Sequence, residues 1–222
     1  MIECIPNNDT QKRFLLGEGG RKELLAIGLN PSTANEITLD PTSRNIQTIA
    51  KNNDCDGWWL VNLYPLRTSN PKKLPKIADK ELIEKNQKFI EQLFSNPKYN
   101  IHKVLCCWGN SIENHLYLEE QARIIKNKIV KKLYSIGKTM NGNPYHPAPM
   151  TVNRYLGGIN NVKLIKYSWN LNIKTDWSQN WGGDDFPNGK AIWYGNNIYV
   201  EKGYYEITLD LLKKSYKFEK LK

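Results

Sequence analysis

The chain has 222 residues, of which 40% are hydrophobic and 24% are charged, and it carries a formal net charge of +10. This composition is typical of a globular protein that is long enough to bury its own core without disulfide bonds. No apolar run approaches the roughly 20 residues that a membrane span needs, and the start MIECIPNNDTQKR has no apolar signal core, so we expect a cytoplasmic protein with no membrane partner.

The first half of the chain predicts a hairpin, a further apolar strand and one helix. Residues 13–16 and 24–29, joined by the glycines of residues 17–20, predict a hairpin that leads into a central sheet. The run WWLVNLYPL, residues 58–66, predicts a second buried strand. Apolar residues then recur on one face over residues 79–94, which predicts an amphipathic helix.

The next segment repeats this alternation. Residues 103–109 predict a third buried strand, and Asn110 is placed to cap a helix that runs to about residue 130. Residues 132–138 predict a fourth strand, followed by a loop over residues 139–151. Because continuous apolar strands alternate with helices, we expect an α/β domain with a mostly parallel sheet covered on both faces.

The tail after this domain has a different composition. Aromatic residues separated by turn signals predict a strand, a long loop, a β-hairpin and a short C-terminal helix. We therefore divide the chain into an α/β domain over residues 1–166 and an aromatic-rich extension over residues 167–222 that packs on the same domain. The aromatic side chains either stack on nucleic-acid bases or form a small core. They are Trp169, Trp177, Trp181, Trp193, Tyr194, Tyr199, Tyr204 and Tyr205.

Three unusual loops follow predicted strands. They contain Asn30-Pro31, the segment from Asn62 to residue 66, and His146 between prolines. Because ligands of parallel sheets bind beyond the carboxyl ends of the strands, these loops are expected to converge on one site. Each loop also has an architectural explanation, as an Asx turn, a backbone-bonding amide or an ordinary loop histidine.

Charge and cysteine content indicate the kind of partner. The excess of 32 Lys and Arg over 22 Asp and Glu suits a polyanion, although scattered lysines also serve solubility alone. The four cysteines have no metal-binding spacing and there are only three histidines. We therefore expect reduced structural cysteines, no metal and no cofactor.

The loop residues favour one reaction. They include neither a pair of carboxylates, nor a nucleophile beside a base, nor a phosphate loop. An amide that holds water and an imidazole that stabilises an anion suffice for cleavage of an N-glycosidic bond, because its transition state is dissociative and its leaving group is anionic.

The order of these motifs resembles the uracil-DNA glycosylase superfamily. GLNPS (28–32) is similar to its first motif, VNLYPL (61–66) to its base-reading segment, CCWG (106–109) to its W-G element and HPAP (146–149) to its H-P-S-P motif. The likeness covers residues 12–166. LDPTSR (39–44) resembles a second element of a bacterial branch of unknown function.

This resemblance implies a three-layer α/β/α domain, to which the tail adds its aromatic-rich β-hairpin extension. The resemblance also implies residue roles. Asn30 would position the attacking water, His146 would stabilise the departing base, and Asn62 would read the edge of a flipped base. Asp40 and Arg44 would hold the pocket loop or contact the base; the alternative is a helix cap with an ion pair.

The size of Ser32 indicates which base is the expected substrate. The strict uracil enzymes have a blocking tyrosine soon after the proline of the first motif, whereas Ser32 follows Pro31 directly in this chain. A pyrimidine enlarged at C5, such as the hydroxymethylated or glucosylated cytosine of phage DNA, would then fit. Uracil or a mismatched base is the alternative substrate, and a non-catalytic nucleic-acid-binding module is the alternative function.

The remaining expectations concern DNA. Met150 or Tyr155 would wedge into the duplex while the base is flipped, and Lys138 and Arg154 would contact phosphates. The protein is expected to act as a monomer. Replacing Asn30 by aspartate is expected to retain or raise activity, since a carboxylate can take a proton from water.

Overall fold

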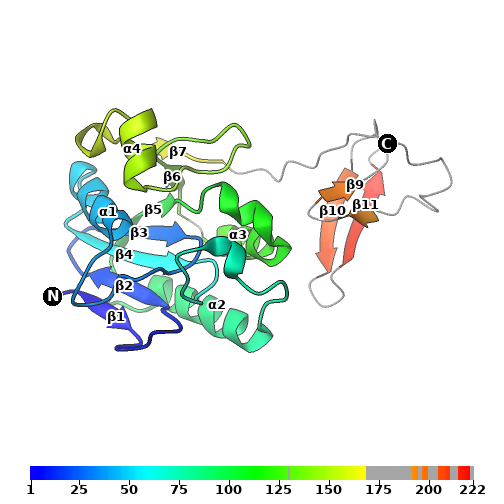
Figure 1. Cartoon of the computed structure of the whole chain (residues 1–222), viewed down its shortest axis with the longest axis horizontal. Helices are drawn as coiled ribbons and strands as arrows, with labels where there is room; N and C mark the ends of the chain where they lie inside the picture. Colours follow the sequence, from blue (N-terminus) through cyan, green and yellow to red (C-terminus); the bar gives the residue numbers. More distant parts are fainter. Residues whose placement is uncertain (130, 169–191, 195–196, 200–204, 211–214, 221–222) are drawn as a thin grey trace. The chain divides into compact units, whose positions relative to one another are not determined.

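The computed structural model describes residues 1–129, 131–168, 192–194, 197–199, 205–210 and 215–220 (Figure 1). The chain divides into two compact units, Met1–Asn170 and Leu171–Lys222. Each unit is described by itself. None of the helices in the described part of the chain has the length and apolar character that a membrane span needs.

The first unit is built around a mixed sheet of seven strands, which confirms the α/β class. Its four central strands are parallel, and antiparallel strands flank them on both sides. The spatial order is β1 (Glu3–Ile5), β2 (Leu15–Glu18), β4 (Gly57–Asn62), β3 (Glu23–Gly28), β5 (Ile101–Cys106), β6 (Leu133–Ser135) and β7 (Ile165–Lys166).

In the described part of the first unit, four α-helices and three short 3₁₀ helices connect these strands (Figure 1). Asp40 and Asp79 begin the first two α-helices, since each carboxylate accepts a hydrogen bond from a backbone N–H in the first turn. The elements are α1 (Pro41–Asn52), η1 (Pro71–Lys73), α2 (Lys80–Ser95), η2 (Asn110–Asn114), α3 (Leu116–Lys128), α4 (Pro149–Tyr155) and η3 (Ile159–Asn161).

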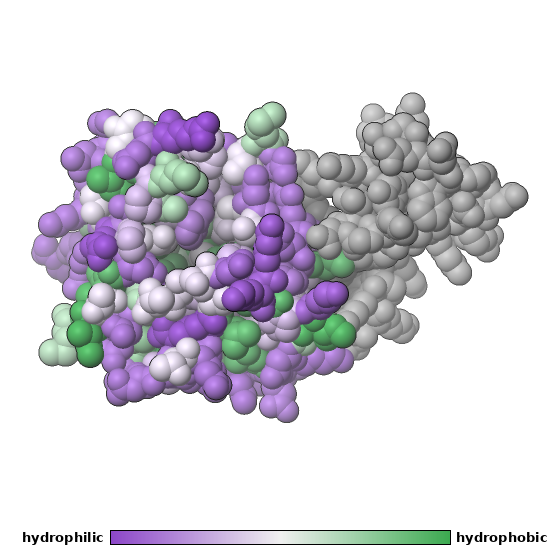
Figure 2. Space-filling model, in the orientation of Figure 1, coloured by the Kyte–Doolittle hydropathy of each residue, from purple (hydrophilic) through white to green (hydrophobic). Residues whose placement is uncertain are grey.

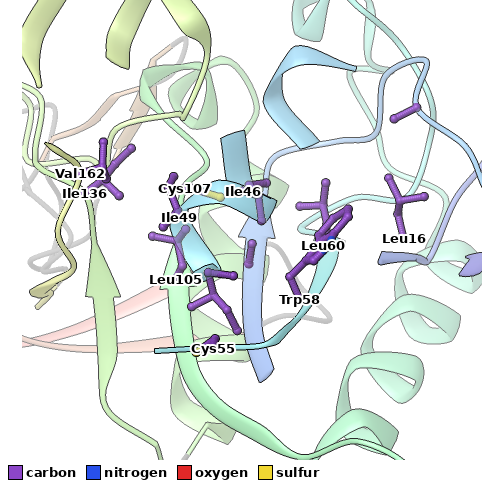
Figure 3. Close-up of a cluster of buried hydrophobic side chains, with 14 of the residues drawn as sticks. Leu16, Ile46, Ile49, Cys55, Trp58, Leu60, Leu105, Cys107, Ile136 and Val162 are labelled. Carbon is purple, nitrogen blue, oxygen red and sulfur yellow. The ribbon is translucent and has the colours of Figure 1, made fainter. Parts of the chain in front are cut away.

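The core lies against the central strands. Ile46 and Ile49 of α1 belong to a buried cluster with Trp58 and Leu60 of β4 and Leu105 of β5 (Figure 3). Every residue of β3 and β4 is buried, so both faces of these strands are covered. This burial explains why the sequences of the two strands are continuous apolar runs, without alternation of apolar and polar residues.

The predicted hairpin between residues 13–16 and 24–29 is wrong, because β4 lies between β2 and β3. The intervening loop crosses the start of β4, where the carbonyl of Lys22 accepts from the backbone N–H groups of Asp56 and Gly57. A Cβ atom on Gly20 would lie 2.5 Å from the backbone nitrogen of Gly57. The glycines therefore allow a close crossing and not a two-strand turn.

Two helix predictions also need correction. Asn110 does not cap the long helix: residues 110–114 form η2, and α3 begins after His115. The short C-terminal helix is wrong as well, since β11 (Ser215–Lys220) is a strand. Its sequence SYKFEK places aromatic residues at alternate positions, which is the period of a strand.

The described residues of the second unit form two antiparallel pairs of strands. β8 (Ile192–Tyr194) pairs with β9 (Asn197–Tyr199), and β10 (Tyr205–Asp210) pairs with β11. Trp169, Trp177, Trp181 and Tyr204 lie outside the described residues. The packing of the extension on the domain and the stacking of its aromatic rings on bases both stay predictions.

Candidate functional site

The predicted loops meet at the carboxyl edge of the parallel strands. Gly28 at the end of β3 pairs with Asn62 at the end of β4. On the other side of β3, the N–H of Cys107 donates to the carbonyl of Ile27 over 2.9 Å. The carbonyl of Cys107 lies 3.0 Å from Nδ1 of His146. The first loop therefore stands between the loops that carry Asn62 and His146.

The side chain of Asn30 is held in one orientation. Its Nδ2 donates to the carbonyls of Pro31 and Thr68, over 2.9 and 2.8 Å, and lies 3.5 Å from the carbonyl of Leu66. Because carbonyl oxygens only accept hydrogen bonds, the amide nitrogen must face them and Oδ1 must point elsewhere. Asn30 therefore joins two loops through its nitrogen and retains an oxygen that can accept from water.

The ring of His146 is also held in one orientation. Its Nδ1 must carry the proton, since its partner is the carbonyl of Cys107. Its Nε2 lies 3.4 Å from Oγ1 of Thr42. Burial lowers the pKa of His146 below its ordinary value, against the opposing effects of the Cys107 carbonyl and the Asp40 charge. At neutral pH the imidazole is therefore uncharged and Nε2 is an acceptor.

This tautomer changes the role expected of His146. A neutral ring with a bare Nε2 cannot donate a hydrogen bond to the oxygen of a departing base. The ring can support the base only after it has gained a proton. Its ground state is instead that of a general base, with one nitrogen oriented by a backbone carbonyl and the other accessible to a hydroxyl group.

The segment LDPTSR explains how His146 is supported. Asp40 caps α1, its Oδ1 accepting from the N–H of Ser43 over 2.8 Å. This cap places Thr42 beside the imidazole, and Nδ2 of Asn45 donates to the carbonyl of Pro147 over 2.8 Å. Of the two explanations for Asp40, the helix cap is confirmed. Sequence reasoning missed Thr42, although it belongs to the D-P-T motif.

The ion pairs of the described residues do not include the alternative one between Arg44 and Asp40. The side chain of Arg44 is exposed, and its guanidinium donates to the backbone carbonyl of Leu39, at the start of the same turn. It therefore braces the loop before α1, and a contact with a base stays a prediction.

Asn62 is buried in this structure, with 2% of its surface exposed. A Cβ atom on Gly28 would lie 2.8 Å from its Oδ1, so the glycine makes room for this amide. Its Nδ2 has no hydrogen-bond partner among the described residues. An unpaired buried donor is unfavourable. Nδ2 of Asn62 can therefore donate to a group that binds at this edge of the sheet. The role of Asn62 in reading the edge of a base stays a prediction.

Ser32 lines an open pocket of about 460 Å³ next to this edge. The pocket is formed by three loops that carry mostly hydroxyl and amide side chains. Neither Asn30 nor His146 contributes to its wall. The lining residues are Asn8, Asp9, Thr10, Ser32, Thr33, Asn35, Arg67, Thr68 and Ser69.

The predicted DNA contacts lie on and near α4, which begins three residues after His146. Met150 is 75% exposed, and Tyr155 is 56% exposed. The ring of Tyr155 stacks on that of Tyr145 at 5.4 Å between centroids, and the guanidinium of Arg154 lies over it. Met150 thus has more freedom to insert than Tyr155. Lys138 is exposed.

The cysteines are free and buried, as predicted. Burial raises the pKa of Cys107 to about 12 and that of Cys106 well above its ordinary value. A thiolate nucleophile is therefore disfavoured at these two positions.

The fold and this edge define an α/β protein with a partly buried histidine and oriented amides at the carboxyl ends of a parallel sheet. Residues 13–148 match the family described as Protein of unknown function (DUF1643), and the chain belongs to this family. The matched segment includes Asn30, Asp40, Asn62 and His146. Neither the curated proteins nor the solved structures contain a match.

The family match corrects the resemblance stated above. No similarity to the uracil-DNA glycosylase superfamily accompanies the match to DUF1643. The short motifs GLNPS, VNLYPL and HPAP therefore do not assign the chain to that superfamily. Each motif has a local structural cause here: an amide that joins loops, the end of a buried strand, and a proline-flanked turn before a helix.

Proposed function

We propose that the protein is a monofunctional DNA glycosylase that hydrolyses the N-glycosidic bond of a flipped pyrimidine. One observation carries the proposal. The hydrogen bond of Nδ1 leaves Nε2 of His146 as an acceptor, and the oriented amide of Asn30 lies at the same sheet edge. The expected substrate is a cytosine enlarged at C5, as in phage DNA, and the expected role is defence against phage. The product is an abasic site.

The proposed chemistry needs only groups of this chain. Oδ1 of Asn30 accepts a hydrogen bond from water and orients its oxygen toward C1′ of the deoxyribose. The oxygen–C1′ bond forms, the bond from C1′ to the base nitrogen breaks, and the base leaves with the electron pair. Nε2 of His146 accepts the proton that water loses, and the resulting imidazolium returns it to the departing base. The Thr42 hydroxyl, 3.4 Å from Nε2, orients the ring until water replaces it, because the single lone pair of Nε2 accepts from one donor at a time.

DNA as the partner is supported by charge and by exposed side chains. The net charge of +10 favours a polyanion, and the visible face of the first unit is largely hydrophilic (Figure 2). Flipping a base out of a duplex costs a few kcal/mol. Exposed Met150 would fill the space that the base leaves, and Arg154 and Lys138 would contact phosphates.

The preference for an enlarged pyrimidine is supported by Ser32. The residue is small and lines the polar pocket beside the sheet edge. A hydroxymethyl or sugar substituent would find hydroxyl and amide partners there. We infer further that helices cover both faces of the sheet in three layers, and that the protein acts as a cytoplasmic monomer without a cofactor.

The first test is release of the base. We expect the full chain to release the base from DNA that carries hydroxymethylcytosine or its glucosylated form, and to leave unmodified DNA intact. Strand breakage after heating in alkali measures the abasic sites. Release from uracil-containing DNA alone would support a repair glycosylase, and DNA binding without release would support a binding module. Either result contradicts the proposed substrate.

The pH dependence tests the role of His146. Because burial lowers its pKa below 6.5, the ring is unprotonated at pH 7 and remains so as the pH rises. We expect the single-turnover rate to be constant between pH 7 and pH 8 and to fall as the pH drops through the pKa of His146. A rate that rises on acidification would instead require the imidazolium in the ground state, and it would contradict the general-base role.

A further inference from the structure

We propose that the pocket lined by Ser32, Thr33, Arg67 and Ser69 is a binding site for a phosphate group. The pocket lies outside the pair Asn30 and His146. The glycosylase proposal offers the same pocket, through Ser32, to the C5 substituent of the base, so the inference names a second ligand group for this wall. It does not rest on base release, because binding of a phosphate is measured without it. The phosphate belongs either to the backbone of DNA or to a free nucleotide.

Two guanidinium groups lie at the base of the loop that forms one wall. Nη1 of Arg67 donates to the carbonyls of Ser32 and Ala34, over 2.8 and 2.9 Å. Nη1 of Arg13 donates to the same carbonyl of Ala34 over 2.8 Å. Arg13 is only 1% exposed. Two positive charges thus converge on a single carbonyl oxygen.

Among the described residues, no carboxylate lies within ion-pair distance of either guanidinium group, although the charge of Asp9 acts on Arg67 from further away. The ion pairs formed within the described ranges include neither Arg13 nor Arg67. Burial and the nearby charge of Arg67 lower the pKa of Arg13 to about 10, against the attraction of the more distant Asp40. Arg13 therefore remains cationic at neutral pH, and a bound anion would relieve the repulsion between the two guanidinium groups.

The one carboxylate in the pocket wall is already engaged. Oδ1 of Asp9 accepts from the backbone N–H groups of Gln11 and Lys12, over 2.7 and 2.9 Å, and its Oδ2 lies 3.9 Å from the Lys12 ammonium. These partners offset the negative charge of Asp9. Arg67 is therefore the charged side chain of the pocket wall that forms no ion pair with another described residue.

The remaining wall suits an oxyanion. Hydroxyl groups of Thr10, Ser32, Thr33, Thr68 and Ser69 and the amides of Asn8 and Asn35 surround the space, and such groups donate hydrogen bonds to phosphate oxygens. A volume of about 460 Å³ holds a phosphate with an attached sugar.

The walls are tied to one another before any ligand binds. The N–H of Arg67 donates to the carbonyl of Gln11 over 2.7 Å, and the N–H of Thr68 donates to that of Pro31 over 2.8 Å. These bonds join the three loops, so the pocket is preformed.

The test places a negative charge in the pocket. Thr33 is exposed and lines the pocket, whereas Thr38 is exposed on the same loop and does not line it. Thr33→Glu and Thr38→Glu therefore change the charge equally and differ in location. Ser69→Glu, on another wall, replaces the first variant if Thr33→Glu fails to fold. Thermal melting establishes that the variants are folded.

The probes are inorganic phosphate, deoxycytidine monophosphate and a short unmodified DNA duplex, titrated by calorimetry at constant ionic strength. Thr33→Glu is expected to weaken binding of at least one probe by about tenfold or more, and Thr38→Glu by no more than about twofold. Loss confined to DNA identifies the backbone as the source, and loss confined to the small probes identifies a free nucleotide. The proposal is overturned if wild-type protein binds none of the probes, or if both variants weaken binding equally.

Discussion

Replacing His146 with alanine is expected to reduce base release by about 10² to 10⁴-fold, the range that general acid–base groups contribute. The neutral ring has its Nδ1 proton directed at the carbonyl of Cys107, so Nε2 is the atom that can take a proton from water. Alanine removes that acceptor. The measurement is the single-turnover rate of abasic-site formation on the modified DNA, with DNA affinity measured alongside it.

Matched controls separate catalysis from folding. His102 is exposed on β5, and His102→Ala is expected to leave the rate unchanged. Thr42→Val removes the hydroxyl that lies 3.4 Å from Nε2, and it is expected to lower the rate by less than His146→Ala does. Thr42→Ser keeps the hydroxyl and is expected to keep the wild-type rate. If His146→Ala retains the wild-type rate with normal DNA binding, His146 is not the base.

Replacing Asn30 with aspartate is expected to destabilise the protein and to lower base release. This reverses the expectation from the sequence that Asn30→Asp retains or raises activity. The amide nitrogen donates to the carbonyls of Pro31 and Thr68, and a carboxylate there would face acceptors with no proton to donate. Each polar group left unpaired costs about 1–3 kcal/mol, and a charged one costs more.

Urea unfolding at pH 7 measures the stability of this variant, and the rate of base release measures its activity. Asn30→Ala is expected to lose both the hydrogen bonds that Nδ2 donates to the loop carbonyls and the oxygen that accepts from water, so both stability and base release should fall. Asn70→Asp is the matched control. Asn70 uses its Oδ1 to accept from the N–H of Lys72, and a carboxylate oxygen can accept this hydrogen bond equally well. That variant is expected to be as stable as the wild type. An Asn30→Asp protein that is both stable and more active would restore the role first inferred from the sequence.

The elements of the fold were predictable to different degrees. The strands around residues 24–29 and 58–66 and the helix over residues 79–94 are present as β3, β4 and α2 with shifted ends. Burial on both faces gives a strand a continuous apolar run, and burial along one stripe gives a helix a periodic pattern, so both can be recognised in the sequence. The pairing of β2 with β4 was missed, because these strand partners are 40 or more residues apart in the chain.

The candidate site divides in the same way. The sequence by itself determined that Asn30, Asn62 and His146 follow or flank strands of a parallel sheet, and therefore that they lie at its carboxyl edge. Only the tertiary structure decided what each group can do there. The proton on Nδ1 of His146 follows from the carbonyl of a residue 39 positions away, and Thr42 lies 104 positions from the ring it contacts. Hydrogen-bond partners that are distant along the chain leave no periodic pattern, so the direction of each amide and imidazole is known only after the loops have packed.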